Sequence, residues 1–214
     1  MRIIAGDLRR RTLLTNPGMT TRPITDRAKV MLFDHIRWEL KGARVADIFA
    51  GTGTMGFESL SRGALSAVFC EADHRAHELL VENARLLNVT ERCLCWRVDV
   101  FRCSFRPKGE SEWNPFGVIF FDPPYSMVKD IRPGSVLYKS LSRLARPDVS
   151  TENALLVFRT PAEAEYELPA IWKPEMELDI GSMKIALLRK SSEQADSTTD
   201  DDTPSDDDTS EAQD

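Results

Sequence analysis

Short apolar runs alternate with amphipathic segments between residues 44 and 190. An apolar run of four to eight residues bounded by turn signals is typical of a strand covered on both faces. Runs of this kind predict strands over residues 44–49, 67–71, 95–98, 118–122 and 154–158. Helical spacing between them predicts helices over residues 55–62, 75–87 and 136–145.

The last part of this region has a different pattern. Residues 176–180 and 183–188 are joined at Gly181-Ser182 and predict a β-hairpin. Strands that alternate with helices of this length predict an α/β fold with a mainly parallel sheet covered on both faces. We therefore expect an α/β domain over residues 44–190, with the antiparallel hairpin at its end.

Charge is distributed unevenly along the chain. Its net charge is -6, but residues 191–214 contain eight Asp, two Glu and no Lys or Arg. Such a segment cannot bury enough apolar surface to offset its ordering entropy, so we expect a disordered acidic tail. A solubilising role is the simplest interpretation of this tail, and competition with RNA for the basic N-terminal segment is the alternative.

Without the tail, the chain has 28 basic and 24 acidic residues. The first 44 residues contain ten Lys and Arg and four Asp and Glu. We expect residues 1–43 to form a basic N-terminal extension with a helix. A locally basic end of a protein is suited to a phosphate-rich partner such as a nucleic acid.

The sequence indicates a cytoplasmic protein without a metal. No apolar signal-peptide core follows Met1, and no apolar run is long enough to span a membrane. The cysteines lack the spacing of a metal site, and we expect them to be reduced and to pack as small apolar side chains. They are Cys70, Cys93, Cys95 and Cys103.

A glycine-rich loop follows the first predicted strand and precedes a predicted helix. It contains Gly51, Gly53 and Gly56. Open α/β sheets bind ligands at the carboxyl ends of their strands, where this loop lies. Gly51 and Gly53 lack Cβ atoms and let the backbone approach a ligand, whereas Gly56 lets the helix pack close to a strand. The spacing also fits a dinucleotide-binding fingerprint, so NAD is an alternative ligand.

Acidic residues lie near the ends of the first three predicted strands, in positions that suit S-adenosylmethionine. Asp47 can face the positively charged amino-acid end of this cofactor, directly or through water. Glu71 can accept hydrogen bonds from both ribose hydroxyls, a feature shared with NAD enzymes, and Asp99 can accept one from the adenine amino group. An ordinary solvated loop residue is the alternative for Asp99. We also assign Phe49, in the glycine-rich loop, to the cofactor site.

The fourth predicted strand ends in Asp122-Pro123-Pro124-Tyr125, the most specific motif in the chain. The prolines fix the backbone and contribute no N–H, so the Pro123 carbonyl can point outward as a rigid acceptor beside the Asp122 carboxylate. An exocyclic amine has two N–H donors and matches this pair. Tyr125 offers a face on which a base can stack. The alternative, a structural proline turn, does not explain the glycine-rich loop and acidic residues upstream.

Two acceptors that hold both amine hydrogens can turn the nitrogen lone pair out of the base ring and toward a methyl group. The methyl then leaves the sulfonium by an in-line displacement. Positioning is the main catalytic contribution, because a sulfonium is already a good leaving group. The motifs together predict a methyltransferase that acts on an exocyclic amine of a nucleic-acid base.

The chain resembles the bacterial RsmD-type 16S rRNA guanine-N2 methyltransferases. Beyond the two loops, the similarity lies in Arg2-Ile3-Ile4-Ala5-Gly6, in Arg22-Pro23-Ile24-Thr25-Asp26-Arg27 followed by Leu32-Phe33, and in Glu58-Ser59-Leu60-Ser61-Arg62-Gly63-Ala64. It extends over residues 1 to about 190 at the level of motifs. Lys29 replaces an arginine usual in the family, and Val30 stands where an acidic residue is common.

The resemblance implies a Rossmann-like class I S-adenosylmethionine-dependent methyltransferase with a seven-stranded sheet. It implies that Arg22, Thr25 and Arg27 lie near the cofactor and the RNA. The implied target is the N2 amine of one guanine in small-subunit ribosomal RNA. The implied partner is 16S rRNA or the small ribosomal subunit, and we expect a monomeric enzyme.

Basic residues before the catalytic sheet are candidate phosphate contacts. Phosphate contacts supply most non-specific affinity for nucleic acids. The candidates are Arg9, Arg10, Arg11, Arg22 and Lys29. The alternative is an ordinary solvated surface.

Three other functions compete with guanine-N2 methylation. The Asp-Pro-Pro-Tyr chemistry serves equally an adenine-N6 methyltransferase acting on DNA or RNA, and only the N-terminal resemblance favours guanine. A non-catalytic RNA-binding ribosome assembly factor would not need the intact motif at residues 122–125. An NAD-dependent oxidoreductase would need a hydride-transfer site, for which the sequence offers no candidate.

Overall fold

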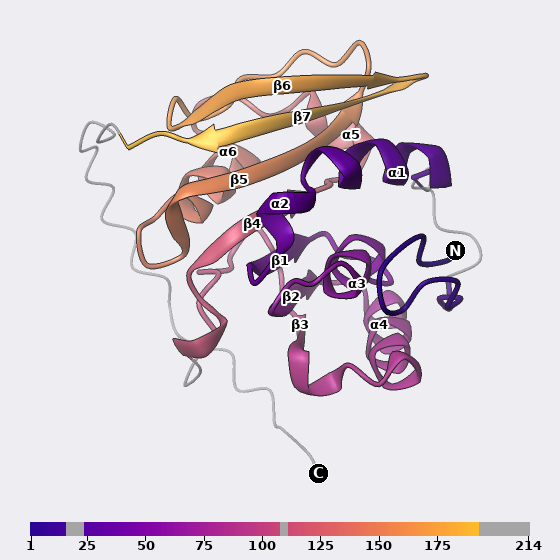
Figure 1. The fold of residues 1–214 in the computed structure, drawn as a ribbon. Helices are drawn as coiled ribbons and strands as arrows, with labels where there is room; N and C mark the ends of the chain where they lie inside the picture. The colour runs from indigo at the N-terminus through magenta and orange to yellow at the C-terminus, as the bar shows by residue number, and fades with distance from the viewer. Residues whose placement is uncertain (16–23, 108–110, 193–214) are drawn as a thin grey trace.

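A single mixed sheet of seven strands organises the protein (Figure 1). The computed structural model describes residues 1–15, 24–107 and 111–192. The strands lie in the order β3-β2-β1-β4-β5-β7-β6. The first five in sequence pair in parallel, and β7 pairs antiparallel with both β5 and β6. The predicted fold class, a mainly parallel Rossmann-like sheet with a terminal antiparallel hairpin, is confirmed.

The elements follow the predicted alternation closely. The strands are β1 (Arg44–Ile48), β2 (Ser66–Glu71), β3 (Cys93–Arg97), β4 (Phe116–Phe121), β5 (Ser150–Pro161), β6 (Trp172–Ile180) and β7 (Met183–Lys190). The helices are α1 (Asp26–His35), α2 (Arg37–Leu40), α3 (Thr54–Ser61), α4 (His74–Leu87), α5 (Tyr125–Val128) and α6 (Val136–Leu144), with 3-10 turns η1 (Thr90–Arg92) and η2 (Ser111–Trp113). The four-residue helices α2 and α5 were not predicted, because one turn is too short to show helical periodicity.

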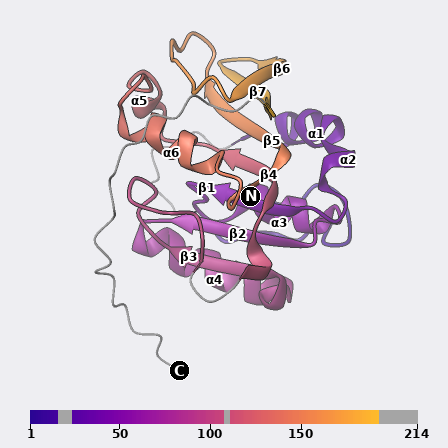
Figure 2. The ribbon, with the colours of Figure 1, turned by 90° about the vertical axis from the view of Figure 1, so that its left-hand side faces the viewer.

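Helices cover both faces of the sheet (Figure 2). On one face, apolar side chains of α1, α3 and α4, among them Phe33 and Phe57, form one core cluster with the strands. On the other face, α5 and α6 contribute Val128 and Leu141 to a second cluster. Because side chains alternate between the faces of a strand, β4 serves both clusters, with Phe120 on the first face and Phe121 on the second.

The N-terminal residues are fastened to α3 by a buried carboxylate. Glu58 has no exposed surface, and it accepts hydrogen bonds from the backbone N–H groups of Ile4 at 2.8 Å and Ala5 at 3.1 Å. It also accepts one from Arg62 Nε at 2.9 Å. Ile3 is buried in the same core cluster as α1 and α3. The N-terminal segment is therefore packed onto the α/β body.

The described residues hold no helix that is both long and apolar enough to cross a membrane. Nor do they hold a group of three or more His, Cys, Asp or Glu side chains arranged to bind a metal ion. The four cysteines are free thiols, with Cys70 and Cys103 buried and the other two half-buried.

Candidate active site

The glycine-rich loop, Glu71, Asp99 and the Asp-Pro-Pro-Tyr motif lie at the carboxyl ends of four neighbouring strands. Ile48, at the end of β1, lies opposite Cys70 of β2 on one side and Phe121 of β4 on the other. The chain runs outward from β1 through β2 to β3 and then continues on the other side with β4 and β5. Open α/β sheets bind ligands at such a reversal of strand order. The glycine-rich loop and the Asp-Pro-Pro-Tyr loop therefore meet at the position favoured for a ligand.

The glycine-rich loop turns through left-handed backbone conformations. Phe49 has φ 64°, Gly51 has φ 57° and Gly53 has φ 87°. A Cβ atom on Gly51 would meet nothing within 4 Å, so this backbone is open to a ligand, as the sequence suggested.

The other two glycines are needed for packing inside the protein, which for Gly53 differs from the expected close approach to a ligand. A Cβ atom on Gly53 would lie 2.4 Å from Cε2 of Phe57. One on Gly56 would lie 2.2 Å from Cε1 of Phe69 in β2, because α3 packs tightly on the sheet there. Of the three glycines of the motif, Gly51 is therefore open to a ligand, whereas Gly53 and Gly56 lie close to side chains of the core.

Glu71 is held rigidly at the end of β2. Its Oε2 accepts the N–H of Gly51 at 2.7 Å, and its Oε1 accepts the N–H of Asp73 at 2.8 Å. Each carboxylate oxygen has a second lone pair and can accept a further hydrogen bond. The side chain is thereby oriented beside the open glycine, and its ribose-binding role stays a prediction.

Asp47 is buried beneath the loop, and its Oδ2 accepts the N–H of Gly56 at 2.9 Å. Burial raises the pKa of Asp47 to about 8, and the nearby carboxylates of Asp122 and Glu71 raise it further against the opposing hydrogen bond. A bound cation would favour the ionised form of Asp47. A positively charged ligand bound beside Asp47 would therefore favour release of its proton.

Asp99 lies in the loop after β3 and is exposed. Its Oδ1 accepts the N–H of Phe101 at 2.9 Å, so the carboxylate is part of a local turn. Phe101 packs near Phe49, with 6.2 Å between the ring centroids. An adenine-binding role for Asp99 and a cofactor contact for Phe49 stay predictions.

Asp122 forms a two-pronged ion pair that sequence analysis missed. Arg159 of β5 donates from Nε to Oδ1 of Asp122 at 2.8 Å, and its Nη2 lies 2.7 Å from Oδ2. The Arg159 side chain is only 9% exposed and that of Asp122 is 24% exposed. Burial raises the pKa of Asp122, and the Arg159 guanidinium opposes this shift. Arg159 thus orients the carboxylate and supplies its counter-charge.

The two prolines have different roles in the structure. The carbonyl of Pro124 accepts the N–H of Met127 at 2.9 Å and starts α5. Among the described residues no hydrogen bond occupies the Pro123 carbonyl. The ring of Tyr125 lies under the Arg159 guanidinium, 5.6 Å from its carbon to the ring centroid. Stacking of a target base on Tyr125 stays a prediction.

The residues assigned through the family resemblance lie at the start of α1. Thr25 caps this helix, because its Oγ1 accepts the N–H of Ala28 at 3.2 Å. Thr25 and Arg27 are both exposed. Arg22 lies outside the described residues, as does the acidic segment from residue 193 onward.

The assignment of Lys29 to RNA binding is wrong. Its side chain has no exposed surface; Nζ donates to the carbonyl of Arg2 and lies 3.7 Å from Oε2 of the buried Glu58. Lys29 lies on the inner face of α1, so its ammonium is drawn to Glu58 and away from solvent. Burial lowers the pKa of Lys29, while Glu58 and Asp26 oppose this shift.

The other basic candidates remain available to a partner. Arg9, Arg10 and Arg11 are exposed in a turn, and Arg11 donates to the carbonyl of Leu86. Contact of these three side chains with phosphates stays a prediction.

Replacing Glu71 by alanine is expected to weaken cofactor binding by about 10- to 150-fold, the effect of losing about 1.5–3 kcal/mol of hydrogen bonding to a charged acceptor. Part of this loss would come from release of the Gly51 loop, which Glu71 holds. Titration calorimetry with S-adenosylmethionine measures the effect, and Glu78→Ala on the exposed face of α4 is the matched control. Equal affinities of wild type and Glu71→Ala would exclude Glu71 from the site.

Comparison with known proteins agrees with this geometry. The family model described as "Conserved hypothetical protein 95" matches residues 1–189. A putative rRNA methyltransferase, YlbH of Bacillus subtilis, is 36% identical over 129 residues, which cover 60% of this chain and 69% of YlbH. Ribosomal RNA small subunit methyltransferase D of Escherichia coli is 28% identical over 194 residues, which cover 90% and 91% of the two chains.

A solved structure of a methyltransferase is also similar to this chain. The putative methyltransferase yhhF of Escherichia coli superimposes with a TM-score of 0.73 at 27% sequence identity, covering 90% of this chain and 99% of that chain. Because the family model covers nearly all of the described α/β body and its N-terminal segment, the chain belongs to the Conserved hypothetical protein 95 family, the RsmD-type family that its motifs indicated.

Proposed function

We propose that this protein transfers a methyl group from S-adenosylmethionine to the exocyclic N2 of a guanine in small-subunit (16S) ribosomal RNA. The observation that carries the proposal is the position of the Asp-Pro-Pro-Tyr loop directly beside the glycine-rich loop, at the ends of the paired strands β4 and β1. Relatives named as rRNA methyltransferases support the same reaction and an RNA substrate.

The residues around the glycine-rich loop fit S-adenosylmethionine. Gly51 presents open backbone, and Glu71 is oriented beside it to accept hydroxyl hydrogen bonds. The buried Asp47 provides a carboxyl that a cationic ligand would ionise. When bound, the cofactor supplies a methyl group on a sulfonium, which needs no further activation. The part of this chain is to bind and orient both reactants.

Asp122 and the Pro123 carbonyl hold the target amine. Each accepts one N–H of the exocyclic nitrogen, which directs the lone pair toward the methyl group. Arg159 keeps the Asp122 carboxylate oriented and charged while the amine binds. Aligning the reacting atoms in this way converts a bimolecular step into an effectively unimolecular one. This removes a large part of the activation barrier.

The carboxylate of Asp122 matches guanine better than adenine. A carboxylate has only acceptors. Guanine presents two adjacent donors, N1–H and the N2 amine, whereas adenine presents the acceptor N1 beside its N6 amine. The Asp122 carboxylate, with a guanidinium as counter-charge, therefore matches the guanine edge better.

The proposal includes a monomeric enzyme that works in the cytoplasm on 16S rRNA or the small ribosomal subunit. It includes phosphate contacts from Arg9, Arg10 and Arg11, since these exposed cations follow a segment fastened to α3. Arg27 and Thr25 are further candidates for contacts near the cofactor. Each assignment predicts a loss of RNA or cofactor affinity on substitution by alanine.

The decisive test combines methyl transfer with nucleoside analysis. The purified protein is incubated with labelled S-adenosylmethionine and with 16S rRNA or small subunits from a strain that lacks the gene. Mass spectrometry of the digested RNA is expected to show N2-methylguanosine. Detection of N6-methyladenosine instead would show that the target base is adenine and not guanine. No methylation of either RNA form would reject the proposed function.

A further inference from the structure

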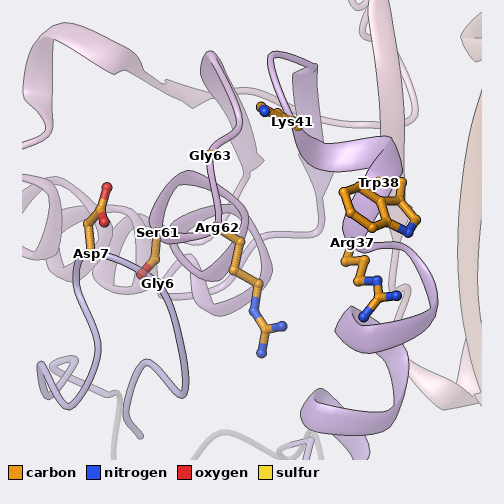
Figure 3. A pocket seen from close by; sticks show the side chains of 8 residues that line it. All are labelled: Gly6, Asp7, Arg37, Trp38, Lys41, Ser61, Arg62 and Gly63. Carbon is orange, nitrogen blue, oxygen red and sulfur yellow. The ribbon is translucent and has the colours of Figure 1, made fainter.

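A pocket with basic residues in its lining lies away from the glycine-rich loop, where α2 and the end of α3 meet the N-terminal segment (Figure 3). Its volume is about 420 Å³. Gly6 and Asp7 lie on one side, Arg37 and Trp38 of α2 on the other, and Arg62 between them. The pocket lies at the opposite end of α3 from the glycine-rich loop, about 12 Å along an eight-residue helix.

The pocket is built on fixed backbone. Gly6 approaches α3 so closely that a Cβ atom there would lie 1.7 Å from the carbonyl oxygen of Ser61. The N–H of Asp7 donates to that oxygen at 2.9 Å. Glu58 holds the preceding residues through two more backbone N–H groups. The backbone on the N-terminal side of the pocket is therefore already held in place.

Its lining joins an exposed aromatic ring to cations. Trp38 is 75% exposed, the highest value among large apolar side chains in the described part of the chain. The guanidinium carbon of Arg37 lies 4.9 Å from the centre of its ring. Lys41 also lines the pocket, and no ion pair between described residues involves Arg37 or Lys41.

The third cation has a different role. Arg62 donates to the buried Glu58 at 2.9 Å and lies 3.4 Å from Asp34, so its charge is compensated within the protein. The charges left for a ligand are those of Arg37 and Lys41, against one carboxylate, Asp7. The pocket is therefore suited to an anionic ligand that also has a flat ring.

We propose that this pocket binds a single-stranded segment of the RNA substrate, with a base on Trp38 and phosphates at Arg37 and Lys41. Binding of single strands combines aromatic stacking platforms with cations that contact the backbone. The inference rests on the proposed function, and it gives the enzyme a contact with RNA separate from the target base. Such a contact would fix the register of the RNA on the protein without taking part in methyl transfer.

The test measures affinity for an unmodified, full-length 16S rRNA transcript across salt concentrations, using the full chain. Trp38→Ala is expected to weaken binding by about 5- to 150-fold, the range for loss of one base–aromatic stack, with an unchanged salt slope. Trp38→Phe should retain most of the affinity. Arg37→Ala with Lys41→Ala should lower the slope of log affinity against log salt by about 0.7 for each phosphate that the variant no longer binds. In steady-state assays the loss should appear in KM for RNA and not in kcat.

The matched control removes two exposed cations from other faces, Lys139 of α6 and Lys173 of β6. It should change the affinity less than the pocket variants do. Wild-type affinity and slope in all pocket variants, or equal losses in the control, would overturn the inference. Tighter RNA binding by Trp38→Ala would also overturn it.

Failure of this inference is distinguishable from failure of the proposed function. If the wild-type protein transfers methyl groups to the transcript or to the small subunit while the pocket variants bind like wild type, only the pocket inference is rejected. If the wild-type protein methylates neither, the proposed function is rejected and the pocket inference with it.

Discussion

Asp122→Ala is expected to lower the rate of methyl transfer by about 100- to 1,000-fold, as does removal of a single group that stabilises a transition state in other enzymes. The affinity for S-adenosylmethionine should change little, because the proposed mechanism places Asp122 against the target amine and not the cofactor. Single-turnover transfer at saturating RNA measures the first effect, and titration calorimetry measures the second. Loss from kcat and kcat/KM together would show that the interaction acts in the transition state.

The control for this experiment concerns stability. Removing Asp122 leaves Arg159 as a poorly solvated charge without its main partner, which costs about 3–5 kcal/mol for a fully buried pair and less here, where Asp122 is partly exposed. Asp122→Asn keeps one acceptor oxygen and the shape of the side chain, so it should fold better and retain part of the activity. A folded Asp122→Ala variant with a near-wild-type rate would contradict the amine-holding role.

Arg159→Met is expected to move the acidic limb of the pH–rate profile to higher pH. Burial raises the pKa of Asp122 and the Arg159 guanidinium lowers it, so removing the guanidinium raises the pKa further. At a pH below this new pKa the carboxyl is protonated and has lost an acceptor for the amine. We expect kcat at pH 7 to fall relative to wild type and to recover in part in alkaline buffer, where the carboxyl is ionised again.

Other groups around Asp122 define the controls. Asp47 from β1 lies near this carboxylate, and the charge of Asp122 contributes to the raised pKa of Asp47. Tyr125 from α5 packs against the same guanidinium. Arg159→Lys retains the positive charge without the two-pronged geometry, so it should keep the wild-type pH limb at a lower rate. An Arg159→Met variant with an unshifted pH profile would reduce Arg159 to a purely structural residue.

Local patterns were sufficient to predict the sheet. Each strand from β1 to β5 is an apolar run, because a strand covered by helices on both faces must be apolar on both. The sequence places the glycine-rich and Asp-Pro-Pro-Tyr loops at strand ends, because the apolar runs of the first and fourth predicted strands stop there. The short helices α2 and α5 were missed, and β5 and β6 proved longer than predicted, since their ends include exposed polar residues such as Glu152 and Lys173.

The sequence by itself determined the α/β fold, the glycine-rich loop, the Asp-Pro-Pro-Tyr loop and the family, because each depends on residues close together in the chain. Only the tertiary structure decided which distant side chains meet. Phe121 and Phe158 lie opposite each other in β4 and β5, which places the next residues, Asp122 and Arg159, side by side.

Two further features also depended on long-range packing. The sequence predicted that Lys29 is an exposed cation. In the structure it lies on the side of α1 that packs against the core, where it is buried beside Glu58. The pocket around Trp38 exists because three segments converge, from the N-terminus, α2 and the end of α3. Hydrophobic periodicity reports whether a position faces the core, whereas strand register and helix docking decide its partner, and these are set by contacts across the whole chain.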